Sequence, residues 1–246
     1  MPPQKIFDTH IHLWPSTALT PTNHAWMTPG HALAKRHGIS DYLAITTPQP
    51  TGFIYVETDR YLPSSTPQDS GTAEVEDVLR EWAKEPLDEL RFLRRIVEGE
   101  SEEGDGMRNG EGKLLNGCVI WAPFHLSPST FQKYLHIAES TAGPKLWQKV
   151  VGFRYLLQGK TARQIRELVQ SDAWLDNIAS LGKKWSFDVG VDVNRDGDEG
   201  LEVVGGMVES VRNREGGGDV RFVLSELLRM GGDEKQIQCV CVYTDV

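Results

Sequence analysis

The chain has little cysteine and no long apolar run. Its 246 residues include three cysteines, Cys118, Cys239 and Cys241. This odd number does not suit a disulfide framework, so we expect a reducing, cytoplasmic location. No apolar stretch approaches the roughly 20 residues that a membrane span requires. The first residues also contain no apolar core of a signal peptide.

Positive charge is also scarce. Lys and Arg total 26 against 35 Asp and Glu, which gives a formal net charge of −9. Nucleic acids and anionic membranes attract basic surfaces, so this balance argues against both as partners. The hydrophobic share of 39%, with seven Trp, eight Phe and six Tyr, is sufficient for a sizeable globular core. We therefore expect a small-molecule partner, and the sequence leaves the oligomeric state open.

Apolar strand patterns alternate with helical patterns along the chain. Strands are expected at residues 5–14, 52–57, 115–124, 150–156, 185–192 and 220–224. Helices are expected at residues 30–45, 75–97 with an end or kink at Pro86, 127–142, 162–169, 173–181 and 199–212. This alternation predicts a parallel α/β fold. Residues 98–113 are rich in glycine and acidic residues, and we interpret them as a mobile, solvated insertion.

Two parallel architectures remain. An open doubly wound sheet is one, but no Gly-x-Gly-x-x-Gly follows the first strand, as a dinucleotide site would require. We therefore favour a TIM-like (β/α)8 barrel in a single domain, residues 1–246. The barrel is expected to be incomplete, with six regular strands and a divergent tail over residues 225–246.

The first strand carries the main chemical signal. Successive side chains of a strand alternate between its faces, so Asp8, His10 and His12 share one face and the apolar residues face outward towards helices. Two imidazoles two residues apart can reach one point in space, which suits a divalent metal, with zinc the leading choice. The structural alternative is a hydrogen-bonded polar plug in the barrel mouth.

Further polar residues fall at the carboxyl ends of the expected strands, where barrel active sites lie. Glu57 could bind the metal or a substrate hydroxyl, or form a salt bridge to Arg60 or another cation. Arg154 could hold a carboxylate or lactone oxygen with both arms of its guanidinium, or pair internally with Asp188 or Glu57. Asp188 could accept hydrogen bonds from sugar hydroxyls or orient Arg154.

Two stretches resemble one known family. Residues 7–14, Phe-Asp-Thr-His-Ile-His-Leu-Trp, resemble the opening strand of the amidohydrolase superfamily, in particular the amidohydrolase-related branch with its fuconolactonases, rhamnonolactonases and decarboxylases. Residues 150–158 resemble a Gly-Val-Arg-His-x-x-Gln stretch of its sugar lactonases, with Tyr155 in place of the usual His. Weaker likeness extends the match over residues 5–224. The resemblance suggests Tyr155 as a substrate contact and Trp14 as a wall beside a sugar ring, although Trp14 could equally be packing.

The resemblance implies a function. In this family a bound divalent metal polarises the substrate carbonyl and lowers the pKa of a water molecule, and the lactonases open sugar lactones to hydroxy acids. The family's Asp/Asn-His-x-x-Lys-Pro motif after the sixth strand and its last-strand Asp have no counterpart here. We therefore expect a truncated or differently spliced form that is weak or inactive. The alternatives are a non-catalytic binding protein and a decarboxylase of the same branch.

Overall fold

The computed structural model describes residues 5–67, 74–191, 193–225 and 242–243. The chain forms two compact units. The first comprises residues 1–121 and 133–150, and the second comprises residues 122–132 and 151–246. Within the described ranges, none of the helices combines the length and apolar character needed to cross a bilayer.

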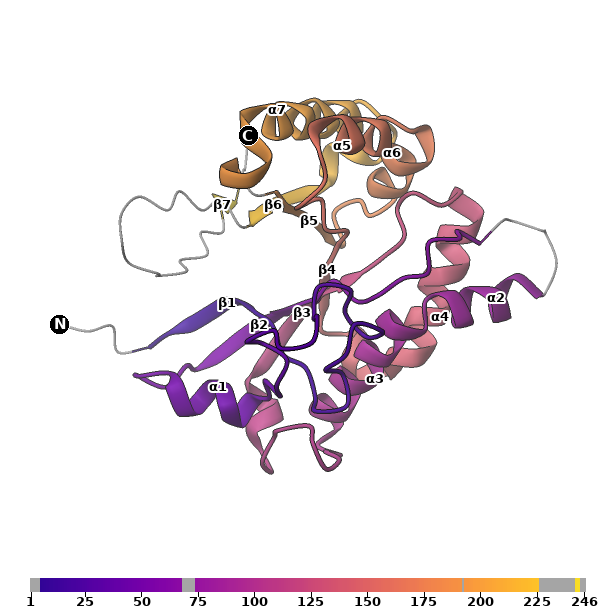
Figure 1. Cartoon of the computed structure of the whole chain (residues 1–246). Coiled ribbons are helices and arrows are strands. Elements are labelled where there is room, and N and C mark those ends of the chain that lie inside the picture. Colours follow the sequence, from indigo (N-terminus) through magenta and orange to yellow (C-terminus); the bar gives the residue numbers. More distant parts are fainter. Residues whose placement is uncertain (1–4, 68–73, 192, 226–241, 244–246) are drawn as a thin grey trace. The chain divides into compact units, whose positions relative to one another are not determined.

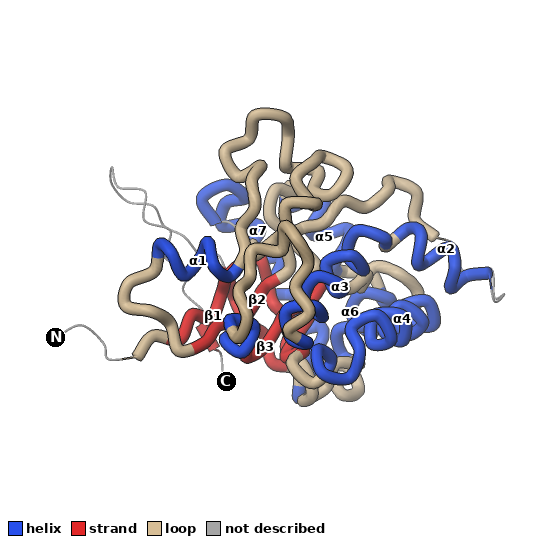
Figure 2. The backbone as a smooth tube through the Cα atoms, turned by 90° about the horizontal axis from the view of Figure 1, so that it is seen from below, coloured by secondary structure: helices blue, strands red, loops and turns tan. Residues whose placement is uncertain are grey.

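The first unit is built on three parallel strands in chain order. They are β1 (Phe7–Ile11), β2 (Gly52–Val56) and β3 (Leu115–Trp121). β1 pairs with β2 with an irregularity between Asp8 and Ile11, and β2 pairs with β3. The three strands lie side by side in both backbone views, with α3 against β3 (Figures 1 and 2). The irregular part of β1 includes His10, and His12 follows directly after the strand.

The second unit also has parallel strands in chain order. They are β4 (Val150–Arg154), β5 (Ser186–Gly190) and β6 (Arg221–Ser225), and the short β7 (Val242–Tyr243) runs antiparallel to β6. Six parallel strands with helices between them confirm the expected α/β class and are consistent with an incomplete TIM-like barrel. Most of the divergent tail, 226–241 and 244–246, lies outside the described residues.

The helices follow the sequence pattern closely. In chain order they are α1 (Ile39–Ile45), α2 (Glu74–Trp82), α3 (Lys84–Glu98), η1 (Glu111–Leu114), α4 (Pro128–Trp147), α5 (Ala162–Val169), α6 (Asp172–Ala179), α7 (Val193–Arg212) and η2 (Gly217–Asp219). Pro86 lies in the first turn of α3, where its missing N–H is not needed. Thr161 caps α5, because its hydroxyl accepts from the backbone of Gln164 and that side chain bonds back to Thr161.

The expected helix over residues 30–45 is wrong in its first half. Helix α1 begins only at Ile39, and residues 30–38 form turns. Gly30 has a φ of 81°, which disfavours a continuous right-handed helix. At Gly38 the backbone approaches another loop so closely that a Cβ atom would lie 2.3 Å from the carbonyl oxygen of Gly106. The helix is short because this stretch packs as a loop against residues 105–106.

The acidic, glycine-rich segment 98–113 is exposed over most of its length, but one of its residues is buried. Asp105 within it is only 2% exposed. Its carboxylate accepts from both arms of Arg95, at 2.7 and 2.8 Å, and from the backbone of Glu102. The Gly104 carbonyl accepts from the backbone of Ser16. The acidic residues had suggested solvation, but one of them is the anchor of the loop.

Candidate functional site

The two first-strand histidines lie together, as the alternation of strand side chains predicts. Their Nε2 atoms are 3.1 Å apart, and the two rings meet edge to face with centroids 4.8 Å apart. Both side chains are half-buried. Two nitrogens at this separation can both lie about 2.0–2.1 Å from one zinc ion, the usual Zn–N distance. The pair thus fits two positions of a metal's coordination shell.

The surroundings of His12 fix its tautomer. Its Nδ1 lies 2.9 Å from the carbonyl oxygen of Val56, the last residue of β2. A carbonyl only accepts hydrogen bonds, so Nδ1 must carry the proton. In the neutral ring Nε2 is then a lone-pair donor that faces His10. Metal-binding histidines commonly donate their other N–H to a backbone carbonyl in this way.

Asp8 shares the histidine face of β1 but is engaged locally. Its Oδ1 accepts from the backbone N–H of His10 at 3.1 Å, and its Oδ2 accepts from the Tyr42 hydroxyl at 3.0 Å. Burial, followed by the bond to Asp8, raises the pKa of Tyr42 to about 12. Tyr42 therefore remains a proton donor at neutral pH, and Asp8 links α1 to the strand that carries the histidines.

Trp14 lies in a group of aromatic rings that follows β1. It is buried, and its indole donates to the Lys35 carbonyl at 2.8 Å. Its ring contacts those of His24, Trp26 and His37, with centroids 4.6–5.9 Å apart. Packing explains these contacts, and a role for Trp14 beside a sugar ring stays a prediction.

A buried hydrogen-bond network follows β2. Glu57 is fully buried, and its Oε2 accepts from the backbone of Asp59 at 2.6 Å. Arg60, for which the sequence suggested Glu57 as a partner, instead bonds Glu89 of α3, with its Nε 3.4 Å from Oε1. The same Glu89 oxygen accepts from the Tyr55 hydroxyl and from the backbone and hydroxyl of Thr58. This network holds the end of β2 against α3.

The remaining candidate residues belong to the second unit. Arg154 and Asp188 are buried and occupy paired positions on the neighbouring strands β4 and β5. Asp188 Oδ1 accepts from the Ser225 hydroxyl at 2.6 Å. The Tyr155 ring packs against Trp174 and His125. Arg154 is the last residue of β4 and Tyr155 follows it, whereas Asp188 is the middle residue of β5. That these residues act together with the histidine pair stays a prediction.

The histidine pair offers a metal ion two protein ligands. No group of three or more His, Cys, Asp or Glu side chains suited to a metal occurs in the ranges that the structure describes. The described donor set is therefore two imidazoles, one of them oriented by a carbonyl. That set fits a divalent ion that takes its remaining ligands from water or substrate.

Comparisons with known proteins give little further. No protein-family profile and no curated protein matches the chain. A solved structure that is similar to it is amidohydrolase 2 from Bifidobacterium longum subsp. infantis. That similarity has 14% sequence identity and a TM-score of 0.30, and it covers 89% of this chain and 82% of the other. Likeness at this level assigns neither a family nor a function.

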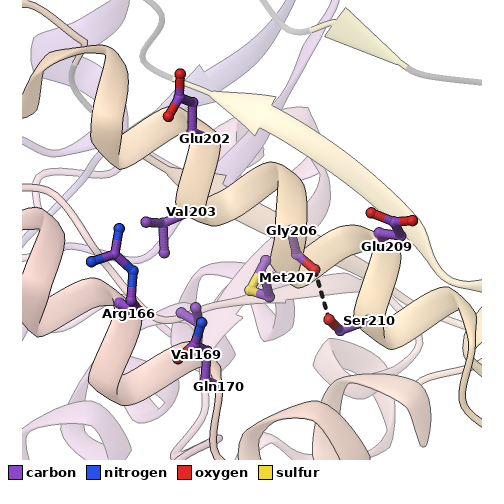
Figure 3. A pocket seen from close by; sticks show the side chains of 9 residues that line it. All are labelled: Arg166, Val169, Gln170, Glu202, Val203, Gly206, Met207, Glu209 and Ser210. Carbon is purple, nitrogen blue, oxygen red and sulfur yellow. Dashed lines mark hydrogen bonds between the residues drawn. The ribbon is translucent and has the colours of Figure 1, made fainter.

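A separate hollow lies between α5 and α7 in the second unit. It has a volume of about 400 Å³. Figure 3 shows its lining side chains, which include the apolar Val169, Val203 and Met207 and the charged Arg166 and Glu202. The Ser210 hydroxyl donates to the Gly206 carbonyl within the helix. None of the residues predicted for the site lines this hollow.

Sequence reasoning missed the residues of α3 that complete the first unit's polar network. Glu89 lies within the helical pattern of residues 75–97, and that pattern assigned it no role. In the structure its side chain is 1% exposed and takes four hydrogen bonds on one oxygen. One signal pointed to it: Pro86, Phe92 and Leu93, three or four positions away on α3, are apolar and share the face of Glu89.

Proposed function

We propose that this protein is a metal-dependent hydrolase of the amidohydrolase-related type that opens a sugar lactone. The observation that carries the proposal is the His10–His12 pair, with Nε2 atoms 3.1 Å apart and His12 oriented by the Val56 carbonyl. The likeness of residues 7–14 to the opening strand of that family supports the substrate class.

His10 and His12 are the residues that would hold the ion. A bound divalent ion, zinc foremost, would polarise the lactone carbonyl and lower the pKa of a water molecule. The proposal names Trp14, Glu57, Arg154, Tyr155 and Asp188 as substrate contacts, with Arg154 suited to a carbonyl or carboxylate oxygen.

Turnover is expected to be slow. Catalytic zinc sites generally use three protein ligands, and the proposal names two. It also names no general base, and a general base typically contributes about 10²–10⁴-fold in rate. We therefore expect weak metal-dependent hydrolysis rather than the rate of an efficient lactonase.

The test has two parts. Zinc, manganese and calcium binding are measured by calorimetry on the wild type, His10→Ala, His12→Ala and the control His31→Ala, which alters an exposed histidine outside the pair. Hydrolysis of a panel of aldonolactones is then followed with the best-bound metal. We expect both pair variants to lose binding and activity, and the control to retain them.

Two results would change the assignment. Metal binding unaffected by either pair variant would remove the histidines from the site. Metal binding at the pair without lactone opening, but with carbon dioxide released from carboxylic acid substrates, would favour the decarboxylase. Metal binding with neither reaction would favour a binding protein.

A further inference from the structure

A buried arginine lines a hollow in the first unit. The Arg60 side chain is only 2% exposed. The hollow beside it has a volume of about 260 Å³ and lies between the loop after β1 and helix α3. Its lining residues are Pro15, Thr17, Ala18, Asn23, Arg60, Lys84, Glu85, Asp88, Arg91, Phe92, Arg95 and Glu102.

The hydrogen bonds of Arg60 leave most of its donors unused. A guanidinium has five N–H donors. Among the described residues its one side-chain partner is Glu89, reached through Nε at a long 3.4 Å. No hydrogen bond from either terminal nitrogen occurs within the described ranges. Buried charged groups need hydrogen-bond partners, and an acceptor in the hollow that Arg60 lines can supply one to its terminal nitrogens.

The other cations around the hollow already have carboxylate partners. Lys84 pairs with Asp88, which also pairs with Arg91. Arg95 pairs with Asp105 and Glu102. Among the lining cations that the structure describes, Arg60 is therefore the one without a carboxylate partner on its terminal nitrogens.

We propose that this hollow binds a small polyhydroxylated monocarboxylic acid, with its carboxylate on the terminal nitrogens of Arg60. The planar fork of a guanidinium matches two carboxylate oxygens. Glu85, Asp88 and Glu102 at the same hollow can accept hydrogen bonds from ligand hydroxyls. The same three carboxylates repel a doubly charged phosphate more than a monocarboxylate, so the local charge favours the acid. A volume of about 260 Å³ accommodates an acid of sugar size.

This site does not depend on the proposed hydrolysis. Its residues exclude the His10–His12 pair, and its test measures binding without metal or turnover. Failure of lactone hydrolysis would leave it standing, and failure of acid binding would leave the hydrolase proposal standing.

The first experiment measures binding to the metal-free wild type by calorimetry, with gluconate, inorganic phosphate and glucose at matched ionic strength. We expect one saturable equivalent of gluconate, phosphate at least about tenfold weaker, a difference of about 1.4 kcal/mol, and no binding of neutral glucose. Absence of gluconate binding would overturn the proposal. Phosphate binding as tight as gluconate would overturn the assignment to a monocarboxylate.

The second experiment places the ligand in the hollow. Thr17 lines it and is exposed, so its substitution leaves the buried network intact. Thr17→Trp fills the opening and is expected to weaken gluconate binding at least about tenfold, whereas the control Thr17→Ser is expected to leave it unchanged. Arg60→Lys keeps the positive charge beside Glu89 but removes the planar guanidinium, and we expect it to weaken gluconate binding to the same extent. If Arg60→Lys does not fold, the comparison of Thr17→Trp with Thr17→Ser alone tests the site. Equal gluconate binding by these two variants would overturn the proposal that the ligand lies in this hollow.

Discussion

The Nδ1 atom of His12 lies 2.9 Å from the carbonyl oxygen of Val56. His12 directly follows β1, and Val56 is the last residue of β2. This contact joins a candidate ligand to the neighbouring strand rather than to a mobile loop. It holds the Nε2 lone pair in a fixed direction before any ion arrives. The orientation of His12 is therefore a property of the sheet itself.

The tautomer of His12 can be measured directly. We expect the neutral ring to carry its proton on Nδ1, because the Val56 carbonyl can only accept. Nitrogen-15 correlation spectra of the histidine side chains in the metal-free protein at pH 7.5 distinguish the two tautomers, and His12→Ala assigns the signal. A signal for His12 protonated at Nε2 would contradict the geometry.

His24 is expected to make the protein sensitive to acid. Burial, followed by the charge of Arg60, lowers its pKa to about 3. Its unfolded value is near 6.5, so the unfolded chain binds the extra proton first, and stability falls as the pH drops from about 6.5 towards 3. Between pH 7 and pH 5 this effect lowers the free energy of unfolding by about 2 kcal/mol.

The acid effect is separable by substitution. His24 Nε2 donates to the Thr58 hydroxyl at 2.9 Å, since that hydroxyl donates to Glu89. His24→Gln keeps a donor there without a titrating ring. Urea unfolding at pH 7 and pH 5 should show a smaller loss for His24→Gln than for the wild type. The exposed control His31→Gln should behave like the wild type, and equal losses in all three would refute the assignment.

Asn177 supports the core of the second unit. Its buried amide donates to the carbonyls of Phe124 and Leu126, at 2.9 and 2.8 Å. Asn177→Ala leaves two carbonyls without this donor, and we expect a loss of about 2 kcal/mol in unfolding free energy. Denaturant titration measures it. Asn213→Ala, at an exposed position, is the control, and a similar small loss in both variants would argue against the role of the amide.

Asp105 is expected to be the anchor of residues 99–110. Removing it leaves the Arg95 side chain, which is 23% exposed, with only the longer contact to Glu102 at 3.6 Å. For Asp105→Ala we expect a loss of about 3 kcal/mol and faster amide exchange in this loop. Glu102→Ala removes the 70% exposed partner of the same arginine, and its loss should stay below about 1 kcal/mol. Unchanged exchange in the Asp105 variant would show that other contacts hold the loop.

Local pattern explains what could be predicted. Strand alternation placed His10 and His12 on one face, and the helical pattern of residues 162–169 matches α5. Pro86 separated α2 from α3 because it cannot serve a helix interior. These features depend on residues within a few positions of each other, and a sequence shows such spacing directly.

Contacts between distant segments explain the rest. The partner of Arg60 is Glu89, 29 positions away, and no spacing rule selects it over the nearer Glu57. Asp105 lies in a stretch whose composition resembles solvated sequence, yet Arg95 draws it into the interior. Helix α1 begins only after Gly38, because Gly106 lies against that glycine. Each outcome depends on which surfaces meet after folding.

The convergence of Tyr55, Thr58 and Arg60 on a single oxygen of Glu89 constrains which substitutions this sequence can accept during evolution. A substitution at position 89 alone would remove the acceptor shared by a guanidinium and two hydroxyls, so it should rarely be inherited by itself. In a lineage that has lost Glu89, we expect Arg60 to have been replaced as well. These positions should vary as a linked set, and the surface of α3 around them should diverge freely.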